Sequence, residues 1–217
     1  MTAATKPRKP RTPLPAEPPA GCRRIKVLSL RQPWASFVIH GFKWCENRTW
    51  RTNHRGELWI HASAGRDDAA WCRELEAEGL PLPRSAILGR VDLRGCWETS
   101  ELLSCQGGDT DHVSEDLHET VCDIADDIQD RVDAKVYGPE GLDETTARRQ
   151  VEDETYRFGW DFVEAPEPGD DFTLWGWVLT DRVPLSEPYP IPGRLNVWTA
   201  DVPADALALP LLETAAK

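Results

Sequence analysis

The alternation of apolar and polar positions over residues 26–63 predicts a strand, a short helix and two more strands. The apolar-rich run Lys26–Leu30 is typical of a buried strand. Because proline suits the first turn of a helix and glycine its end, the apolar residues between Pro33 and Gly41 predict a two-turn helix. After Gly41 the period changes to two, and this strand-like alternation returns over residues 56–63.

The rest of the chain combines helical and strand patterns. Apolar residues recur at steps of three and four between Leu117 and Val132, which predicts an amphipathic helix that ends at Gly138. A second helix is predicted over residues 144–153. The other predicted elements are a helix at residues 67–78 and strands at residues 87–93, 172–180 and 195–199, with a proline-rich loop between the last two strands.

Strands near both ends of the chain, with short helices between them, favour an α+β fold built on a small mixed β-barrel. The 217 residues suffice for one domain with an elaboration. We therefore predict a domain over residues 23–205 with an acidic helical insertion at about residues 98–155. Residues 1–22 are predicted to be a disordered, basic, proline-rich tail, and residues 206–217 a C-terminal tail.

The net charge of −12 is unevenly distributed. Residues 98–155 carry −14, whereas residues 23–97 carry +5. The first half of the domain can therefore still present a cationic face to a polyanion. No apolar run is long enough to span a bilayer, and no apolar signal segment follows the charges of residues 1–22, so we expect a cytoplasmic protein.

The cysteines and histidines give no signal for a metal site. The six cysteines show no C-x-x-C spacing, so they are predicted to be reduced thiols. Cys45, His54 and His61 could in principle share a metal, but nothing in their spacing demands one. We expect no metal and no cofactor.

Candidate chemistry is concentrated in residues 27–63, which hold four of the ten tryptophans and five basic residues. One face of the strand predicted after Gly41 alternates aromatic and charged side chains, namely Trp44, Glu46, Arg48 and Trp50. Two interpretations stay open. The face is either a partly exposed ion pair between packing tryptophans, or the wall of a cleft on which a nucleobase stacks.

Several short blocks of this chain resemble ASCH domains, which are named for homology to an activating-signal cointegrator. In chain order the blocks are LSLRQPWA (28–35), GFK (41–43), ENRTW (46–50), RG (55–56), IHAS (60–63), AILGRVDL (86–93), WGWVL (175–179) and GRLNVW (193–198). The resemblance implies a fold of the PUA-like group of small β-barrels. Because PUA-like relatives largely act on RNA, it also implies RNA as the partner.

One branch of the family is similar to N4-acetylcytidine amidohydrolases. In that branch a lysine follows the first helix, a threonine three residues later is the nucleophile, and a distant glutamate completes the set. Lys43 matches the lysine, but Glu46 stands where the threonine is expected, and a carboxylate cannot serve as a hydroxyl nucleophile.

We therefore predict first an RNA-binding or modified-nucleoside-binding protein with a cationic, tryptophan-lined cleft. The predicted binding residues are Arg31, Lys43, Trp44, Arg48, Trp50, Arg51, Arg55 and His61. The alternative is a nucleic-acid-directed hydrolase, either an amidohydrolase or a ribonuclease, with Lys43 and Glu46 as its catalytic pair. A third interpretation is a protein-interaction adaptor that binds its partner through the acidic helix at residues 115–136.

Overall fold

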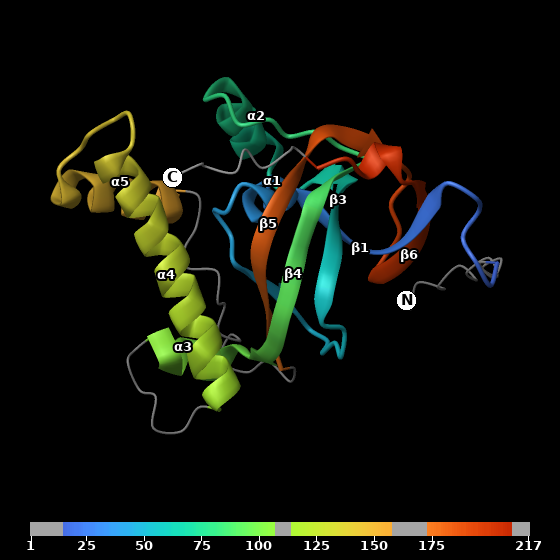
Figure 1. The fold of residues 1–217 in the computed structure, drawn as a ribbon, viewed down its shortest axis with the longest axis horizontal. Coiled ribbons are helices and arrows are strands. Elements are labelled where there is room, and N and C mark those ends of the chain that lie inside the picture. The colour runs from blue at the N-terminus through green and yellow to red at the C-terminus, as the bar shows by residue number, and fades with distance from the viewer. Residues whose placement is uncertain (1–14, 107–113, 158–172, 210–217) are drawn as a thin grey trace, which may run out of the picture.

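The computed structural model describes residues 15–106, 114–157 and 173–209, which form a mixed α+β fold (Figure 1). The strands are β1 (Cys22–Gln32), β2 (Cys45–Arg48), β3 (Gly56–Arg66), β4 (Ala86–Glu98), β5 (Trp175–Pro190) and β6 (Val197–Pro203). The helices are α1 (Trp34–Ile39), α2 (Ala69–Ala77), α3 (Thr99–Gln106), α4 (Glu115–Tyr137), α5 (Glu144–Arg157) and a 3-10 turn, η1 (Asp205–Leu207).

All six strands belong to one sheet, in the order β2-β5-β4-β3-β1-β6. β1 and β3 pair in parallel, and the other neighbours pair antiparallel. β2 and β6 are the two edges of the sheet, and within the described residues they are not hydrogen-bonded to each other. The α+β class is therefore confirmed, whereas closure into a barrel is not.

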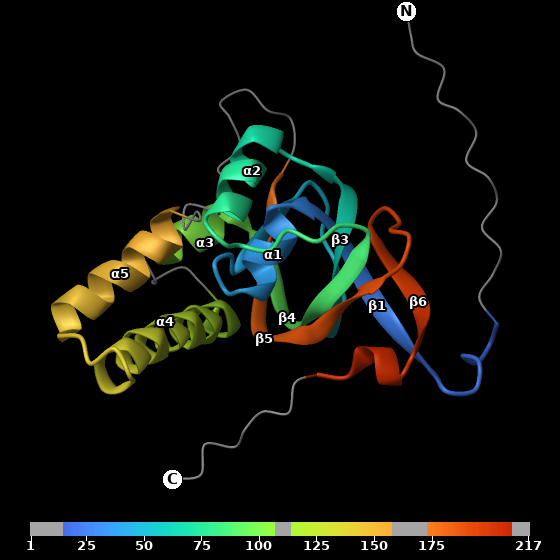
Figure 2. The same ribbon diagram turned by 90° about the horizontal axis from the view of Figure 1, so that it is seen from above.

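The predicted alternation on the central strands is observed as burial on both faces of the sheet. On β3, Leu58 and Ile60 pack into one apolar cluster with α1, which lies against the sheet (Figure 2). Trp59 points the other way and packs with Val27 of β1 and Trp198 of β6. Neighbouring residues on opposite faces are fully buried where β1 and β3 pair, namely Val27 and Leu28 on β1 and Trp59 and Ile60 on β3. This part of the two strands therefore forms a rigid base for the residues at their ends.

The predicted first helix is present as α1. Pro33 precedes it at the N-cap position, and Gly41 follows it with a φ of 79°, a conformation that glycine adopts without strain. The predicted helix at residues 67–78 is present as α2, where the Asp68 carboxylate accepts hydrogen bonds from two backbone N–H groups of the first turn. These capping bonds hold the pKa of Asp68 below its usual value.

The prediction of a proline-rich loop between the last two strands is wrong over much of that segment, because β5 continues to Pro190. Only the first part of β5 pairs on both sides, with β2 and β4, while its later part pairs with β4 alone. A strand with one free side tolerates prolines such as Pro184 and Pro188, since the missing N–H need not point toward a partner.

The described residues between β4 and β5 contain the helices α3, α4 and α5, whereas the bounds of an insertion at residues 98–155 stay a prediction and residues 107–113 lie outside the described residues. The apolar side of α4 packs with Trp44, Cys45 and Leu102, the last from α3, which the sequence analysis did not predict. Arg131 of α4 donates a hydrogen bond to the Gly41 carbonyl at 3.3 Å, so the insertion is docked on the segment after α1. A partner for its acidic face stays a prediction.

Parts of the predicted tails lie outside the described residues, namely residues 1–14 and 210–217. Leu207 of η1, within the segment predicted as a C-terminal tail, is buried against the cluster around Trp59. The predicted domain limits of 23–205 stay a prediction. In the part of the chain that the structure describes, no helix combines the length and apolar character needed to cross a bilayer.

Candidate functional site

A cavity of about 680 Å³ opens where β1, β2, β3 and α1 meet the loop before β6. Its lining combines charged, hydroxyl, amide and aromatic side chains. The polar and aromatic side chains in this lining are Ser29, Arg31, Trp34, Glu46, Arg48, Ser63, Ser85, Arg194 and Asn196. We call this cavity the main pocket.

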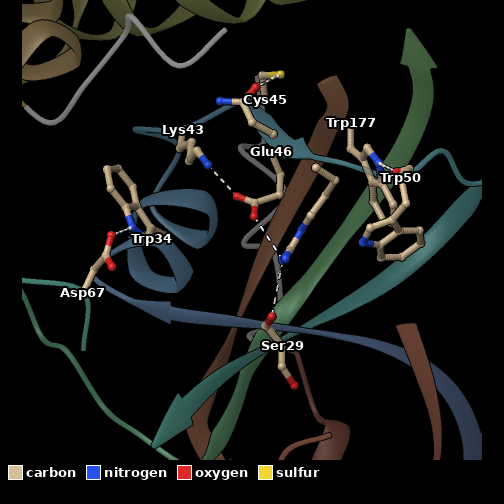
Figure 3. Close-up of polar contacts among 10 residues, drawn as sticks. Ser29, Trp34, Lys43, Cys45, Glu46, Trp50, Asp67 and Trp177 are labelled. Atoms are coloured by element: carbon tan, nitrogen blue, oxygen red, sulfur yellow. Dashed lines mark hydrogen bonds and ion pairs between the residues drawn. The ribbon is translucent and has the colours of Figure 1, made fainter. Parts of the chain in front are cut away.

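Glu46 lies in the pocket between two cations (Figure 3). Its Oε2 accepts a hydrogen bond from Nζ of Lys43, and its Oε1 lies 3.0 Å from a guanidinium nitrogen of Arg48. The Lys43 and Glu46 side chains are only 6% and 9% exposed. Because a buried charge is stable only when it is compensated, the two groups hold each other in place.

Of the three charged residues Lys43, Glu46 and Arg48, Arg48 is the most exposed to solvent, with 26% of its side chain exposed. One guanidinium nitrogen contacts both Glu46 and, at 3.4 Å, the carbonyl oxygen of Ser29 on β1. These contacts fix the guanidinium across the pocket. A planar, fixed guanidinium with further N–H groups can donate to an acceptor of a bound ligand.

Trp34 forms one wall of the pocket, and several contacts fix its ring. The indole Nε1 donates to Asp67 at 2.8 Å, and the ring packs edge-on against Phe37 and Trp71 at 5.8 Å and 5.6 Å. The Lys43 ammonium lies 5.2 Å from the centre of the Trp34 ring. At the rim, Asp67 also forms an exposed ion pair with Arg31 at 3.3 Å.

The loop at residues 192–196 forms another part of the lining, and a hydrogen-bond network beneath it supports it. His61 contacts the Ile191 carbonyl through Nε2 at 3.0 Å and the Ser29 hydroxyl through Nδ1 at 3.1 Å. Trp198 donates to the same hydroxyl at 3.0 Å. Nε2 must carry a proton to donate to a carbonyl, so Nδ1 of the neutral ring accepts from Ser29. Burial lowers the pKa of His61, which favours this neutral form.

The structure brings three of the predicted site residues together in the pocket lining, namely Arg31, Glu46 and Arg48. Lys43 lies directly behind Glu46. The alternation of β2 explains this arrangement, since Glu46 and Arg48 project to the pocket side while Cys45 packs on the other side with α3 and α4.

The two tryptophans predicted on the same face are placed elsewhere. Trp44 is 4% exposed and packs with Leu102 and Leu117 of the insertion, so the prediction that a base stacks on it is wrong in this structure. Trp50 packs edge-on against Trp177, with ring centres 4.6 Å apart, and does not line the pocket (Figure 3). β2 spans only Cys45–Arg48, so its alternation extends to neither tryptophan.

The remaining predicted binding residues do not line the pocket. His61 is fully buried, so it cannot touch a ligand directly and instead supports the pocket wall. Arg51 lies over the Trp175 ring at 5.2 Å, and Arg55 donates to the backbone carbonyls of Thr52 and His54. Both are exposed on the surface.

Among the pocket residues that the sequence analysis did not name are Trp34, Arg194 and Asn196. Each lies in a block that it matched to the family, LSLRQPWA or GRLNVW, so the signal was present. What could not be seen was that a loop some 160 residues later in the chain closes over the end of β1.

The described residues contain no group of three or more histidine, cysteine, aspartate or glutamate side chains that could hold a metal ion. Within the part of the chain that the structure describes, none of the six cysteines forms a disulfide bond. The pocket's own chemistry is therefore that of guanidinium, carboxylate, hydroxyl and indole groups.

Comparison with known proteins finds a family model that matches part of this chain. The sequence profile of the ASCH domain matches residues 28–121, which contain Trp34, Lys43, Glu46 and Arg48. Residues 28–121 of this chain are therefore similar to an ASCH domain.

The ASCH match extends to curated relatives over a limited length. "Activating signal cointegrator 1" of Homo sapiens and that of Mus musculus are each 40% identical to this chain over 80 residues. The match covers 32% of this chain and spans only 14% of the length of each relative.

Two solved structures of ASCH from Zymomonas mobilis are also similar. The first shares 13% identity, covers 83% of this chain and 89% of its own, and has a TM-score of 0.37. The second, a point mutant of the same bacterial protein, shares 15% identity, covers 76% and 75%, and has a TM-score of 0.34.

Proposed function

We propose that this protein belongs to the ASCH family and binds RNA or a modified nucleoside, with one base held in the main pocket. The observation that supports this most strongly is the pocket itself, whose lining combines the aromatic ring of Trp34 with three arginines, Arg31, Arg48 and Arg194. Its volume falls in the range of ligand pockets, and the link of the ASCH family to RNA binding supports the same partner.

Each part of a nucleotide finds a complementary group in this arrangement. The Trp34 indole offers an aromatic surface, and stacking of a base on such a ring contributes about 1–3 kcal/mol. The Arg48 guanidinium donates to carbonyl or ring-nitrogen acceptors on the base edge. Arg31 and Arg194 are exposed and can contact phosphates.

The test is the binding of a fluorescently labelled single-stranded RNA of mixed sequence, followed by anisotropy at several salt concentrations. We expect the affinity to fall with salt, with a log–log slope of about −0.7 per phosphate contact. Arg48→Ala should weaken binding about 10-fold, the effect of losing one charge-assisted hydrogen bond of about 1.4 kcal/mol.

The matched control is Arg149→Ala, which removes an exposed arginine of α5 that lines no part of the main pocket. This variant should bind RNA like the wild type. An affinity that does not respond to salt, or equal losses from both variants, would contradict the proposal.

A second candidate function is hydrolysis directed at nucleic acid, favoured by the position of Glu46 in the pocket beside Lys43. The carboxylate could act as a general base on a water molecule, with Lys43 and Arg48 stabilising the negative charge that develops. Both carboxylate oxygens already contact cations, so one contact would have to loosen during such a reaction.

Turnover of N4-acetylcytidine and of an RNA oligomer tests this second candidate, in the presence and absence of divalent metals. For an enzyme of this kind we expect product from the wild type and a rate at least about 100-fold lower for Glu46→Gln, in line with the usual contribution of general acid–base catalysis. Circular dichroism checks that the variant remains folded. If the wild type forms no product from either substrate, the hydrolase hypothesis is ruled out.

A further inference from the structure

The loop at residues 192–196 forms a ridge between two hollows. On one side lies the main pocket, and on the other a smaller cavity of about 300 Å³ over the start of β6. Pro192, Gly193 and Arg194 line both cavities. A ligand larger than one nucleoside can therefore continue from the main pocket across the ridge into the second hollow.

The ridge is held firmly at its base. The Ile191 carbonyl accepts from His61, and the Ile191 N–H donates to the Ser85 carbonyl at 3.0 Å. Gly193 lies directly on the His61 ring, and Asn196 adopts a φ of 61°. A surface loop fixed in this way keeps its exposed side chains in place before any ligand arrives, which lowers the entropic cost of binding.

The top of the ridge presents one cation and one apolar side chain. The Arg194 guanidinium lies 5.6 Å from the centre of the Trp198 ring, and no described residue forms an ion pair or a side-chain hydrogen bond with it. Leu195 is 67% exposed and lines the main pocket. An exposed guanidinium backed by an indole suits a phosphate or the face of a base.

The second hollow is also suited to a segment of nucleic-acid backbone. Thr199 lines it, and its hydroxyl accepts a hydrogen bond from the exposed Lys26 at 3.1 Å. The one carboxylate in its lining, Asp201, is neutralised by Arg24, which donates to both of its oxygens at 2.7 and 2.9 Å. The cations at its margin can therefore attract a phosphate in spite of this carboxylate.

We propose that the second hollow takes the nucleotide next to the one in the main pocket, with the phosphodiester crossing the ridge at Arg194. Leu195 then packs against the base or sugar at the pocket's outer edge. This inference rests on the proposed function and narrows it, because it makes the ligand an RNA strand of at least two nucleotides rather than a free nucleoside.

The experiment compares the affinities of the four ribonucleosides with those of the four RNA homotetranucleotides, measured by calorimetry on the full chain. We expect the best tetranucleotide to bind the wild type at least about 10-fold tighter than its nucleoside, since it adds phosphate and stacking contacts. Arg194→Gln and Lys26→Ala should each reduce this gain several-fold, and Lys26→Ala, at a residue that does not line the main pocket, should leave the affinity for the nucleoside unchanged.

Two control variants separate the ridge from general effects of charge and exposure. Arg149→Ala removes an exposed arginine elsewhere, and Tyr137→Ser removes the large, 85% exposed side chain at the end of α4, as a match for Leu195→Ser. Both control variants should still bind the tetranucleotide more tightly than the nucleoside by the wild-type factor. Leu195→Ser should reduce this factor.

The possible outcomes are distinct. Loss of the gain in the ridge variants alone supports the inference. A nucleoside that binds as tightly as its tetranucleotide, or a gain that Arg194→Gln leaves intact, overturns the inference while the proposed function stands. If neither class of ligand binds the wild type, the proposed function fails and the inference fails with it.

Discussion

Glu46→Ala is expected to lower the free energy of unfolding by about 3–5 kcal/mol, the usual cost of removing one partner of a buried ion pair. The variant takes the carboxylate away from Lys43, whose ammonium is almost completely buried, and from Arg48. Desolvation of the lysine is then no longer offset by this ion pair. Urea denaturation followed by tryptophan fluorescence measures the change.

The matched control is Asp123→Ala, which breaks the ion pair with Arg94 at 2.6 Å. Both side chains of that pair are more than one-third exposed, so the loss should stay below about 1 kcal/mol. In the double variant Lys43→Met/Glu46→Leu, two apolar side chains of similar size should recover much of the lost stability. If Glu46→Ala and Asp123→Ala lower the free energy of unfolding equally, the buried ion pair contributes no more to stability than the exposed one.

The second large effect is expected from Gly193→Ala. A Cβ atom at this position would lie 2.3 Å from Cε1 of His61, which is fully buried and held by two hydrogen bonds. The ring has no free space, so the ridge must move outward. We expect a loss of about 1–3 kcal/mol in the free energy of unfolding, the usual cost of overpacking.

The same displacement moves Arg194 and the pocket wall, so RNA affinity should fall about 10-fold, equivalent to about 1.4 kcal/mol. Gly65→Ala is the control, because no atom lies within 4 Å of its added Cβ. Denaturation and anisotropy on both variants check the prediction. If Gly193→Ala has the stability and the RNA affinity of the wild type, His61 does not position the ridge.

Local signals in the sequence were enough for several elements. Pro33 and Gly41 mark the limits of α1, and the apolar spacing from Leu117 onward predicts α4 with its end near Gly138. These predictions succeed because capping and helical periodicity depend on neighbours within a few residues. The grouping of Glu46 with Arg48 succeeded for the same reason, through the two-residue period of β2.

What failed depends on contacts between distant segments. The burial of Trp44 depends on packing against the insertion, and the extension of β5 through Pro184 depends on which of its sides is paired. The pocket wall at residues 192–196 depends on a histidine of β3 lying beneath it. A single sequence contains none of these distances, so the residue types of the site were predictable while its walls were not.

β2 separates two regions of opposite charge. Glu46 and Arg48 face the main pocket with its arginines, while Cys45 faces the helices of the acidic insertion, which lie together on one side of the sheet (Figure 1). Such an arrangement gives the molecule an electric dipole moment despite its negative net charge. If RNA is the ligand, as we propose, this dipole turns the acidic helices away from the approaching polyanion and the arginines toward it, so that diffusional encounters begin in the productive orientation.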